Sequence, residues 1–207
     1  MSGKEGGLTP LVLVVGPVET NCYLMPTEQG TLIVDPGDEA ERFEGALRAL
    51  PPPAAVLLTH GHPDHASAAA VLAARLRVTA FAHEGDRDWV EGRLNVWGWS
   101  TPRVECRWVS EDAPPLPGVR VLATPGHSVG SVCYGVGGLW FVGDTVFCGS
   151  VGRTDLPGGD EKALMLSLGR LAEELAPETE LLPGHGPRTT LAQELVHNPW
   201  MQEALGN

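Results

Sequence analysis

Residues 59–65 read THGHPDH, which places three histidines and one aspartate within seven positions of a 207-residue chain that has seven histidines in all. The apolar run AAVLL at 54–58 leads into this stretch, and an Ala- and Leu-rich segment follows it. This pattern predicts a strand, a loop and a helix over about 66–75. Several imidazoles packed beside a carboxylate leave buried polar groups unsatisfied unless a cation organises them. The stretch therefore predicts a metal site on a loop.

Three further apolar runs also lead into loops that carry histidine or aspartate. They are VRVLATPGH (119–127), LWFVGD (139–144) and ETELLPGH (178–185). Because loops at a sheet edge can present polar groups to a cleft, we expect all four loops to gather along one edge. Imidazole nitrogens and carboxylate oxygens suit zinc, iron or manganese. The candidate ligands are His60, His62, Asp64, His65, His127, Asp144 and His185.

The composition, with 43% hydrophobic and 19% charged residues, is typical of a soluble globular protein, and the length fits one domain over residues 1–207. No apolar run approaches the ~20 residues that cross a bilayer, and the N-terminus shows no secretory signal pattern. We therefore expect no membrane partner and a cytoplasmic location. The net charge of −12 opposes nucleic-acid binding, which places Lys and Arg against phosphates.

Short β-rich runs alternate with helical patterns along the chain, which predicts a layered α/β sandwich. Besides the four strands above, we expect strands at 11–15, 21–25, 31–35, 79–83, 104–109 and 131–136. In addition to the helix at 66–75, helices are expected at about 39–50, 160–175 and 189–197.

The motifs HGHPDH (60–65), PGH (125–127), GD (143–144) and GHG (184–186) together resemble those of the metallo-β-lactamase superfamily, over nearly the entire chain. The resemblance implies an α/β (α+β) fold, the four-layer αβ/βα sandwich, with a two-metal centre between two mixed sheets. It also implies a division of the ligands. Metal one would be bound by His60, His62 and His127, metal two by Asp64, His65 and His185, and Asp144 would bridge both.

Two divalent cations of this kind lower the pKa of a shared water and stabilise the oxyanion that forms when the hydroxide attacks a carbonyl. Together with the charges of Asp64, Asp144 and the hydroxide they leave the site positive, which favours an anionic or polarised, ester-like small molecule. A thiolate can leave without protonation because its pKa is about 8.5, whereas an amide nitrogen needs an acid. Thioester hydrolysis therefore demands least of such a site.

Two longer segments, FVGDTVFCGSVGRTDLPGGD (141–160) and PGHGPRTTLAQELVHNPW (183–200), resemble the bacterial glyoxalase II-like, or hydroxyacylglutathione hydrolase-like, group. This resemblance implies hydrolysis of S-2-hydroxyacylglutathione, with Asp64 and Asp144 as catalytic residues. We expect the chain to lack the C-terminal helical domain with which full-length glyoxalase II holds glutathione.

The segment GRTD (152–155) also resembles persulfide dioxygenases of the same superfamily, which use one iron held by two histidines and an aspartate. In either enzyme Arg153 could contact an anionic substrate, or it could pair with Asp155 and fix the loop. A third alternative is a non-catalytic metal-binding module.

Overall fold

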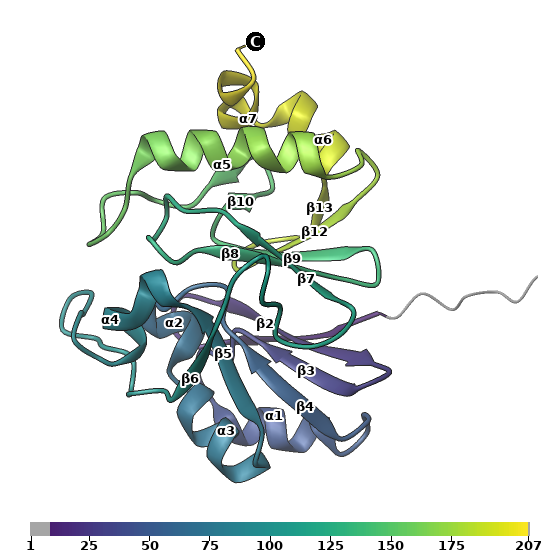
Figure 1. Ribbon diagram of the computed structural model, residues 1–207, viewed down its shortest axis with the longest axis vertical. Coiled ribbons are helices and arrows are strands. Elements are labelled where there is room, and N and C mark those ends of the chain that lie inside the picture. Colours follow the sequence, from purple (N-terminus) through teal and green to yellow (C-terminus); the bar gives the residue numbers. More distant parts are fainter. Residues whose placement is uncertain (1–8, 207) are drawn as a thin grey trace, which may run out of the picture.

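The computed structural model describes residues 9–206, and two β-sheets form its centre (Figure 1). The first sheet has six strands in chain order, with an antiparallel N-terminal meander followed by parallel pairs from β3 onward. Its strands are β1 (Leu11–Val15), β2 (Thr20–Thr27), β3 (Gly30–Val34), β4 (Pro53–Leu57), β5 (Thr79–His83) and β6 (Cys106–Val109).

The second sheet has five strands in the order β13-β12-β9-β8-β7, and only the pair β12–β9 is parallel. Its strands are β7 (Val119–Ala123), β8 (Val132–Val136), β9 (Leu139–Gly143), β12 (Glu180–Pro183) and β13 (Thr189–Thr190). A small separate hairpin joins β10 (Val146–Phe147) to β11 (Ser150–Val151).

Helices cover the outer face of each sheet, so that the order of layers is helices, sheet, sheet, helices (Figure 1). Helices α1 (Ala40–Leu47) and α3 (Ala69–Leu76) lie against the first sheet. Helices α5 (Glu161–Glu174), α6 (Leu191–His197) and α7 (Pro199–Ala204) lie against the second. The four-layer sandwich predicted from the motifs is confirmed.

The alternation of side chains along each strand explains these layers, because successive residues point to opposite faces of a sheet. Ile33 and Val56 belong to the buried cluster shared with α1 and α3. Their neighbours Leu32 and Leu57 belong instead to the cluster between the two sheets, where they join Phe141 of the second sheet. Strands that are apolar on both faces are expected where both faces are covered.

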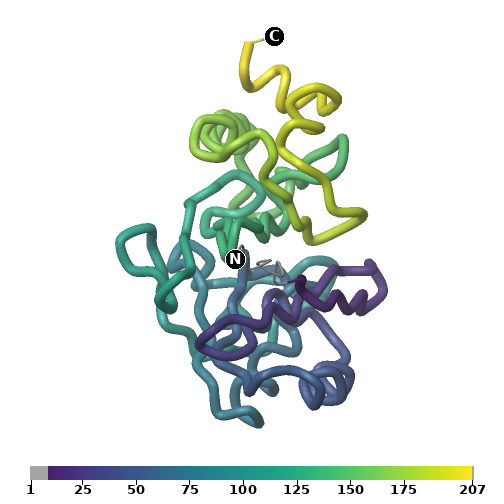
Figure 2. The backbone as a smooth tube through the Cα atoms, turned by 90° about the vertical axis from the view of Figure 1, so that its right-hand side faces the viewer, coloured from purple at the N-terminus to yellow at the C-terminus, as the bar shows by residue number. Residues whose placement is uncertain are grey.

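The direction of the strands brings the candidate ligand loops together. Strands β3 and β4 are parallel, and so are β9 and β12, while β7 runs in the direction of β9 because β8 is antiparallel to both. The loops after β7, β9 and β12 therefore leave the second sheet at the same end, and their candidate ligands lie close to those that follow β4. Figure 2 shows the same division from the side, with the purple and blue N-terminal half below the green and yellow C-terminal half.

Several elements differ from the sequence predictions. The helix expected at 66–75 is two helices, α2 (Pro63–Ala66) and α3. Ser67 N still donates to Pro63 O in the helical pattern, but Ala68 N donates to Pro36 O outside the helix, and this ends α2. A 3₁₀ turn η1 (Glu84–Asp86) and helix α4 (Arg87–Val90) follow β5, and these, α7 and the β10–β11 hairpin were not predicted. The helix expected at 189–197 begins only at Leu191, because Thr189 and Thr190 form β13 instead. No helix within residues 9–206 is long and apolar enough to span a membrane.

Candidate metal centre

The structure brings all seven predicted ligands into one cluster, on the loops that follow β4, β7, β9 and β12. Three groups can be distinguished within it, and in each group one nitrogen or carboxylate oxygen from every member lies within 4.8 Å of the others. The first group is His60, His62 and His127, and the second is Asp64, His65 and His185. A third set, His60, His65 and Asp144, joins these two.

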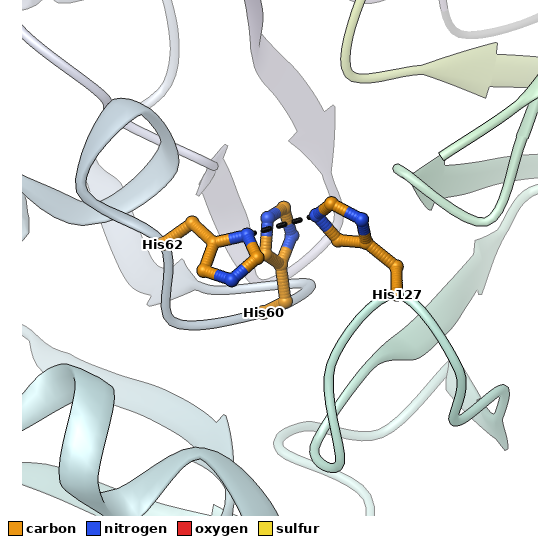
Figure 3. Close-up of side chains that lie close together, drawn as sticks. All are labelled: His60, His62 and His127. Carbon is orange, nitrogen blue, oxygen red and sulfur yellow. Dashed lines mark hydrogen bonds between the residues drawn. The ribbon is translucent and has the colours of Figure 1, made fainter. Parts of the chain in front are cut away.

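The first group consists of three imidazoles from two separate loops. Figure 3 shows His60 and His62 on one loop and His127 on the opposite one, with the rings turned toward one another. His62 Nδ1 lies 2.8 Å from His127 Nε2, and the His60 ring centroid is 4.7 Å from that of each of the other rings. All three side chains are buried. Three ring nitrogens from buried side chains thus lie within 4.8 Å of one another.

The second group combines one carboxylate with two imidazoles. Asp64 and His65 lie in the first turn of α2, where Pro63 occupies the first helical position and starts the helix directly after His62. Asp64 Oδ2 is 3.4 Å from His65 Nε2 and 3.2 Å from His185 Nε2. This group is more open than the first, since Asp64 and His185 are only partly buried.

Asp144 lies between the two groups. Its Oδ1 is 3.2 Å from His65 Nε2, while its Oδ2 is 3.5 Å from His127 Nε2 and 3.6 Å from His185 Nε2. It is the carboxylate that faces members of both groups. A carboxylate in this position can reach both groups.

The rings are held in fixed orientations by contacts on their outer sides. In four of the five histidines Nδ1 lies next to an oxygen atom at 2.7–3.2 Å, which leaves Nε2 free to face the centre. Such contacts are typical of metal-binding histidines, because they set the tautomer and the direction of the ring. The oxygen atoms are Thr59 Oγ1 for His60, Asp35 Oδ2 for His65, the Arg153 carbonyl for His127 and the Val18 carbonyl for His185.

Asp35 is one functional residue that the sequence reasoning missed. It is 1% exposed, and its carboxylate accepts hydrogen bonds from Thr59 N at 2.7 Å and Thr59 Oγ1 at 2.6 Å as well as facing His65. It therefore fixes both the start of the histidine loop and the His65 ring. A signal was present in the sequence, since Asp35 follows an apolar strand in the same way as Asp144 does.

Asp86 is the second residue that was missed. It is 1% exposed and accepts hydrogen bonds at 2.7 Å from Gly61 N, Ser128 Oγ and Gly130 N. Gly61 lies between His60 and His62, and Ser128 follows His127, so one buried carboxylate ties together the two loops of the first group. Burial raises the pKa of Asp86. Asp86 follows β5 in a segment that contains no candidate ligand, so the sequence did not indicate a role for it.

Two glycines allow the loops to approach this closely. A Cβ on Gly184 would overlap Asp144 Oδ1 and the His65 ring, and a Cβ on Gly152 would overlap the Asp144 carbonyl. Gly184 and Gly152 are therefore required because any larger side chain would overlap the ligand cluster, and not because of the backbone conformation of a turn.

The electrostatics differ between the groups. Burial and neighbouring imidazoles lower the pKa of His60 well below its ordinary value, and burial lowers the pKa of His62 to about 3, so both rings are neutral at pH 7. Burial also acts against a proton on His65, but Asp144 and Asp64 together raise its pKa well above the ordinary value. In the second group the negative charges of the carboxylates are therefore balanced by a proton on His65, and a bound cation would replace that proton.

The cluster fits a cation in a further respect. Three of its buried polar atoms have no hydrogen-bond partner among the described residues, namely His60 Nε2, His62 Nε2 and Asp144 Oδ1. A buried polar atom without a partner is costly, and native proteins rarely leave several of them together. Because His60 Nε2 and Asp144 Oδ1 face the centre of the cluster, lone pairs there can be satisfied by bound metal.

A cavity of about 380 Å³ opens over the cluster, and His62, Asp64 and Asp144 form part of its floor. Arg153 lies on its wall. The Arg153 guanidinium also pairs with Asp155 through two hydrogen bonds of 2.6 and 2.7 Å. The pairing with Asp155 that the sequence offered as an alternative is therefore present, and Arg153 lines the cavity at the same time.

Comparison with known proteins gives consistent matches. Residues 15–185 match the family model of the metallo-beta-lactamase superfamily. The probable metallo-hydrolase YqgX of Bacillus subtilis is 33% identical over 90% of this chain and 94% of its own length. The hydroxyacylglutathione hydrolase GloC of Haemophilus influenzae is 31% identical over 92% of this chain and 96% of its own length.

Two solved structures are also similar. TTHA1623, crystallised in a di-iron-bound form, superposes with a TM-score of 0.84 at 41% identity and covers 92% of this chain and 99% of its own. ETHE1 from Myxococcus xanthus superposes with a TM-score of 0.75 at 28% identity and covers 93% of this chain and 84% of its own. Sequence motifs, fold, ligand geometry and these matches agree that the chain belongs to the metallo-beta-lactamase superfamily.

Proposed function

We propose that the chain is a binuclear metallohydrolase that cleaves thioesters, a class that includes S-2-hydroxyacylglutathione. The observation that carries this proposal is the complete second group, Asp64, His65 and His185, joined to the first group through Asp144. A site for a single cation would need only the first group and Asp144. The similarity to a di-iron-bound protein and to a hydroxyacylglutathione hydrolase supports this assignment.

In the proposed site His60, His62 and His127 would hold one divalent cation, Asp64, His65 and His185 would hold the other, and Asp144 would contribute to both. When bound, zinc, iron or manganese supplies an activated water and polarises the substrate carbonyl. Asp64 and Asp144 would be the catalytic carboxylates, because they would hold the cations that activate water and polarise the carbonyl.

The substrate class follows from what the site lacks as well as from what it has. Among the described residues around the cavity no lysine, cysteine or tyrosine stands beside the ligands to protonate a leaving group. A thiolate leaves without such an acid. Arg153 on the cavity wall offers one positive charge to an anionic part of the substrate.

The direct test is a thioester assay without oxygen. The purified protein should release free thiol from S-lactoylglutathione or a simpler lactoyl thioester under anaerobic conditions, and His185→Ala should reduce the rate by on the order of 100-fold or more as its second cation is lost. Leu166→Ala, an exposed substitution on α5, is the matched control and should leave the rate unchanged. Absence of thiol release from every thioester tried would reject the proposal.

A second candidate is an iron-dependent persulfide dioxygenase. The GRTD segment and the similarity to ETHE1 favour it. This enzyme would consume oxygen with glutathione persulfide, and one iron would suffice. Oxygen uptake with persulfide, together with no anaerobic thioester cleavage, would replace the first proposal by the second.

A further inference from the structure

The wall of the cavity above the ligand cluster is mostly apolar. Val18, Val96, Trp97, Trp99, Phe147 and Leu156 contribute to it, and they come from segments far apart in the chain. Arg153 is the one lysine or arginine among the described lining residues. A ligand here therefore meets apolar surface, two indoles and a single fixed positive charge besides the ligand cluster.

The two indoles belong to a small hairpin at residues 95–99. Val96 and Trp99 exchange backbone hydrogen bonds of 2.8 and 2.9 Å, and Asn95 Oδ1 accepts from Gly98 N at 3.1 Å. Trp97 and Gly98 have φ values of 51° and 83°. Positive φ at both central residues is the conformation of a two-residue type I′ hairpin turn. The structure thus holds a tight turn with a tryptophan at its tip.

Tryptophan is a poor choice for that position on folding grounds alone. A bulky side chain at positive φ is a genuine outlier, and Asn, Asp or Gly normally occupies such a turn. The Trp97 side chain is also 82% exposed, so burial in the core does not compensate for the backbone conformation. Strained residues of this kind cluster at ligand sites. An indole placed beside a cavity suggests a surface for stacking.

Arg153 is held in a defined position next to that indole. Its Cζ lies 5.3 Å from the centre of the Trp97 ring, and its Nε and Nη2 donate to the two oxygens of Asp155. No described residue accepts a hydrogen bond from Nη1, which leaves one edge of the guanidinium available. The carbonyl of Arg153 accepts from His127, so this residue connects the cavity wall to the ligand cluster.

We propose that Trp97 and Arg153 form a specificity subsite for the part of the thioester that extends away from the scissile carbonyl, and that this part is an aromatic or other apolar group with one carboxylate. The inference rests on the proposed thioester hydrolysis. The apolar group stacks on Trp97, and the carboxylate receives hydrogen bonds from Arg153 Nη1.

The same wall disfavours glutathione. Glutathione carries two carboxylates, an ammonium group and two amides, and only one of these groups finds a partner in Arg153. Apolar surface next to the others removes their water without replacing its hydrogen bonds, which costs free energy. Asp155 beside Arg153 further opposes a second negative charge.

The test uses three lactoyl thioesters that differ only in the thiol, namely 4-(mercaptomethyl)benzoate, benzyl mercaptan and glutathione. We expect the highest kcat/KM for the benzoate, about tenfold above glutathione. Trp97→Ala should raise KM for both benzyl substrates about tenfold, and Arg153→Met should raise KM for the benzoate alone. The matched controls are Trp200→Ala, an exposed tryptophan on α7, and Arg120→Met, an exposed arginine that stacks on Trp140 at 5.1 Å. Both should behave as wild type.

A binding experiment separates this inference from the proposed reaction. The S-methyl ether of 4-(mercaptomethyl)benzoate, which is not hydrolysed, should quench tryptophan fluorescence in the purified protein and in Trp200→Ala with the same Kd. In Trp97→Ala the Kd of this quenching should be about tenfold higher. Quenching that depends on Trp97, without cleavage of any thioester, would support the subsite and reject the hydrolase. Thioester cleavage that is fastest with glutathione and unaffected by Trp97→Ala would reject the subsite and retain the hydrolase.

Discussion

At the scale of single residues, Asp144 is the side chain on which both ligand groups depend. Its Oδ1 faces His65 and its Oδ2 faces His127 and His185, whereas Asp64 faces members of the second group alone. A carboxamide keeps the volume of a carboxylate but loses the charge that holds a cation. The two aspartates should therefore respond differently to the same substitution.

We expect Asp144→Asn to lose both metals and to lower turnover by on the order of 100-fold or more, while Asp64→Asn loses metal at one position only. Metal analysis of both variants, paired with the anaerobic thioester assay, measures the difference. An Asp144→Asn protein that retained two metals and normal turnover would contradict the bridging position.

Asp86 should act through the ligands that it positions. Asp86→Ala leaves Gly61 N, Ser128 Oγ and Gly130 N without their acceptor, and we expect it to weaken metal binding by the first group about 10- to 100-fold. Metal affinity can be measured by competition with a chromophoric chelator. The control is Asp88→Ala, an exposed aspartate on the next turn that pairs with Arg93. Equal affinities in the two variants would show that Asp86 has no positioning role.

Spacing in the sequence was sufficient to propose the seven ligands, because each follows an apolar strand or lies in the HGHPDH motif. The residues that orient them were not found in this way. Asp86 lies far from Gly61 and Ser128 along the chain but contacts both in the structure, and the sequence does not show this proximity. Trp97 was likewise not among the predicted site residues, and only the structure places it at the cavity.

At the scale of elements, the junction between α6 and α7 supports the loop that carries Arg153. Asn198 is fully buried, and its Nδ2 donates to Ser150 O at 2.9 Å and Glu194 Oε2 at 2.9 Å. Its Oδ1 accepts from Trp200 N at 3.1 Å at the start of α7. One side chain thus caps a helix and ties it to the β10–β11 hairpin.

We expect Asn198→Ala to lower the free energy of unfolding by about 2–4 kcal/mol, because it removes a helix cap and leaves buried partners unsatisfied. Asp160→Ala is the control, since Asp160 caps the start of α5 through Ala163 N at an exposed position, and it should cost about 1 kcal/mol. Urea unfolding of the two variants gives both values. Similar losses would mean that the hairpin contacts of Asn198 contribute nothing.

The elements were predicted best where an apolar period was long. The strands of both sheets except β13, and helices α1, α5 and α6, lie close to their predicted ranges. Short elements were missed, including α7 and the β10–β11 hairpin, because four to six residues carry too little periodicity. Asn198 followed by Pro199 was a usable signal for the start of α7, as both residues favour helix N-termini.

At the scale of the whole molecule, the ligand cluster joins the two sheets. Four of its residues follow β4 of the first sheet, and three follow strands of the second. A metal bound there holds the two sheets together only in the native state, so binding is linked to folding. The sequence favours the same expectation, because the candidate ligands follow strands that lie far apart along the chain.

Removal of metal should therefore lower thermal stability as well as activity. A metal present at about a thousand times its Kd contributes about 4 kcal/mol, which for a chain of this size corresponds to on the order of 10 °C in Tm. Thermal unfolding before and after dialysis against a chelator, followed by metal readdition, measures the shift. An unchanged Tm after verified removal would show that no metal links the sheets.

The number of metal ions per chain tests the central claim most directly. The purified protein, titrated with zinc or iron and freed of excess metal, should retain two equivalents per chain, and His185→Ala should retain one. Saturation of the wild-type chain at one equivalent would contradict the account, because Asp64, His65 and His185 would then hold no metal.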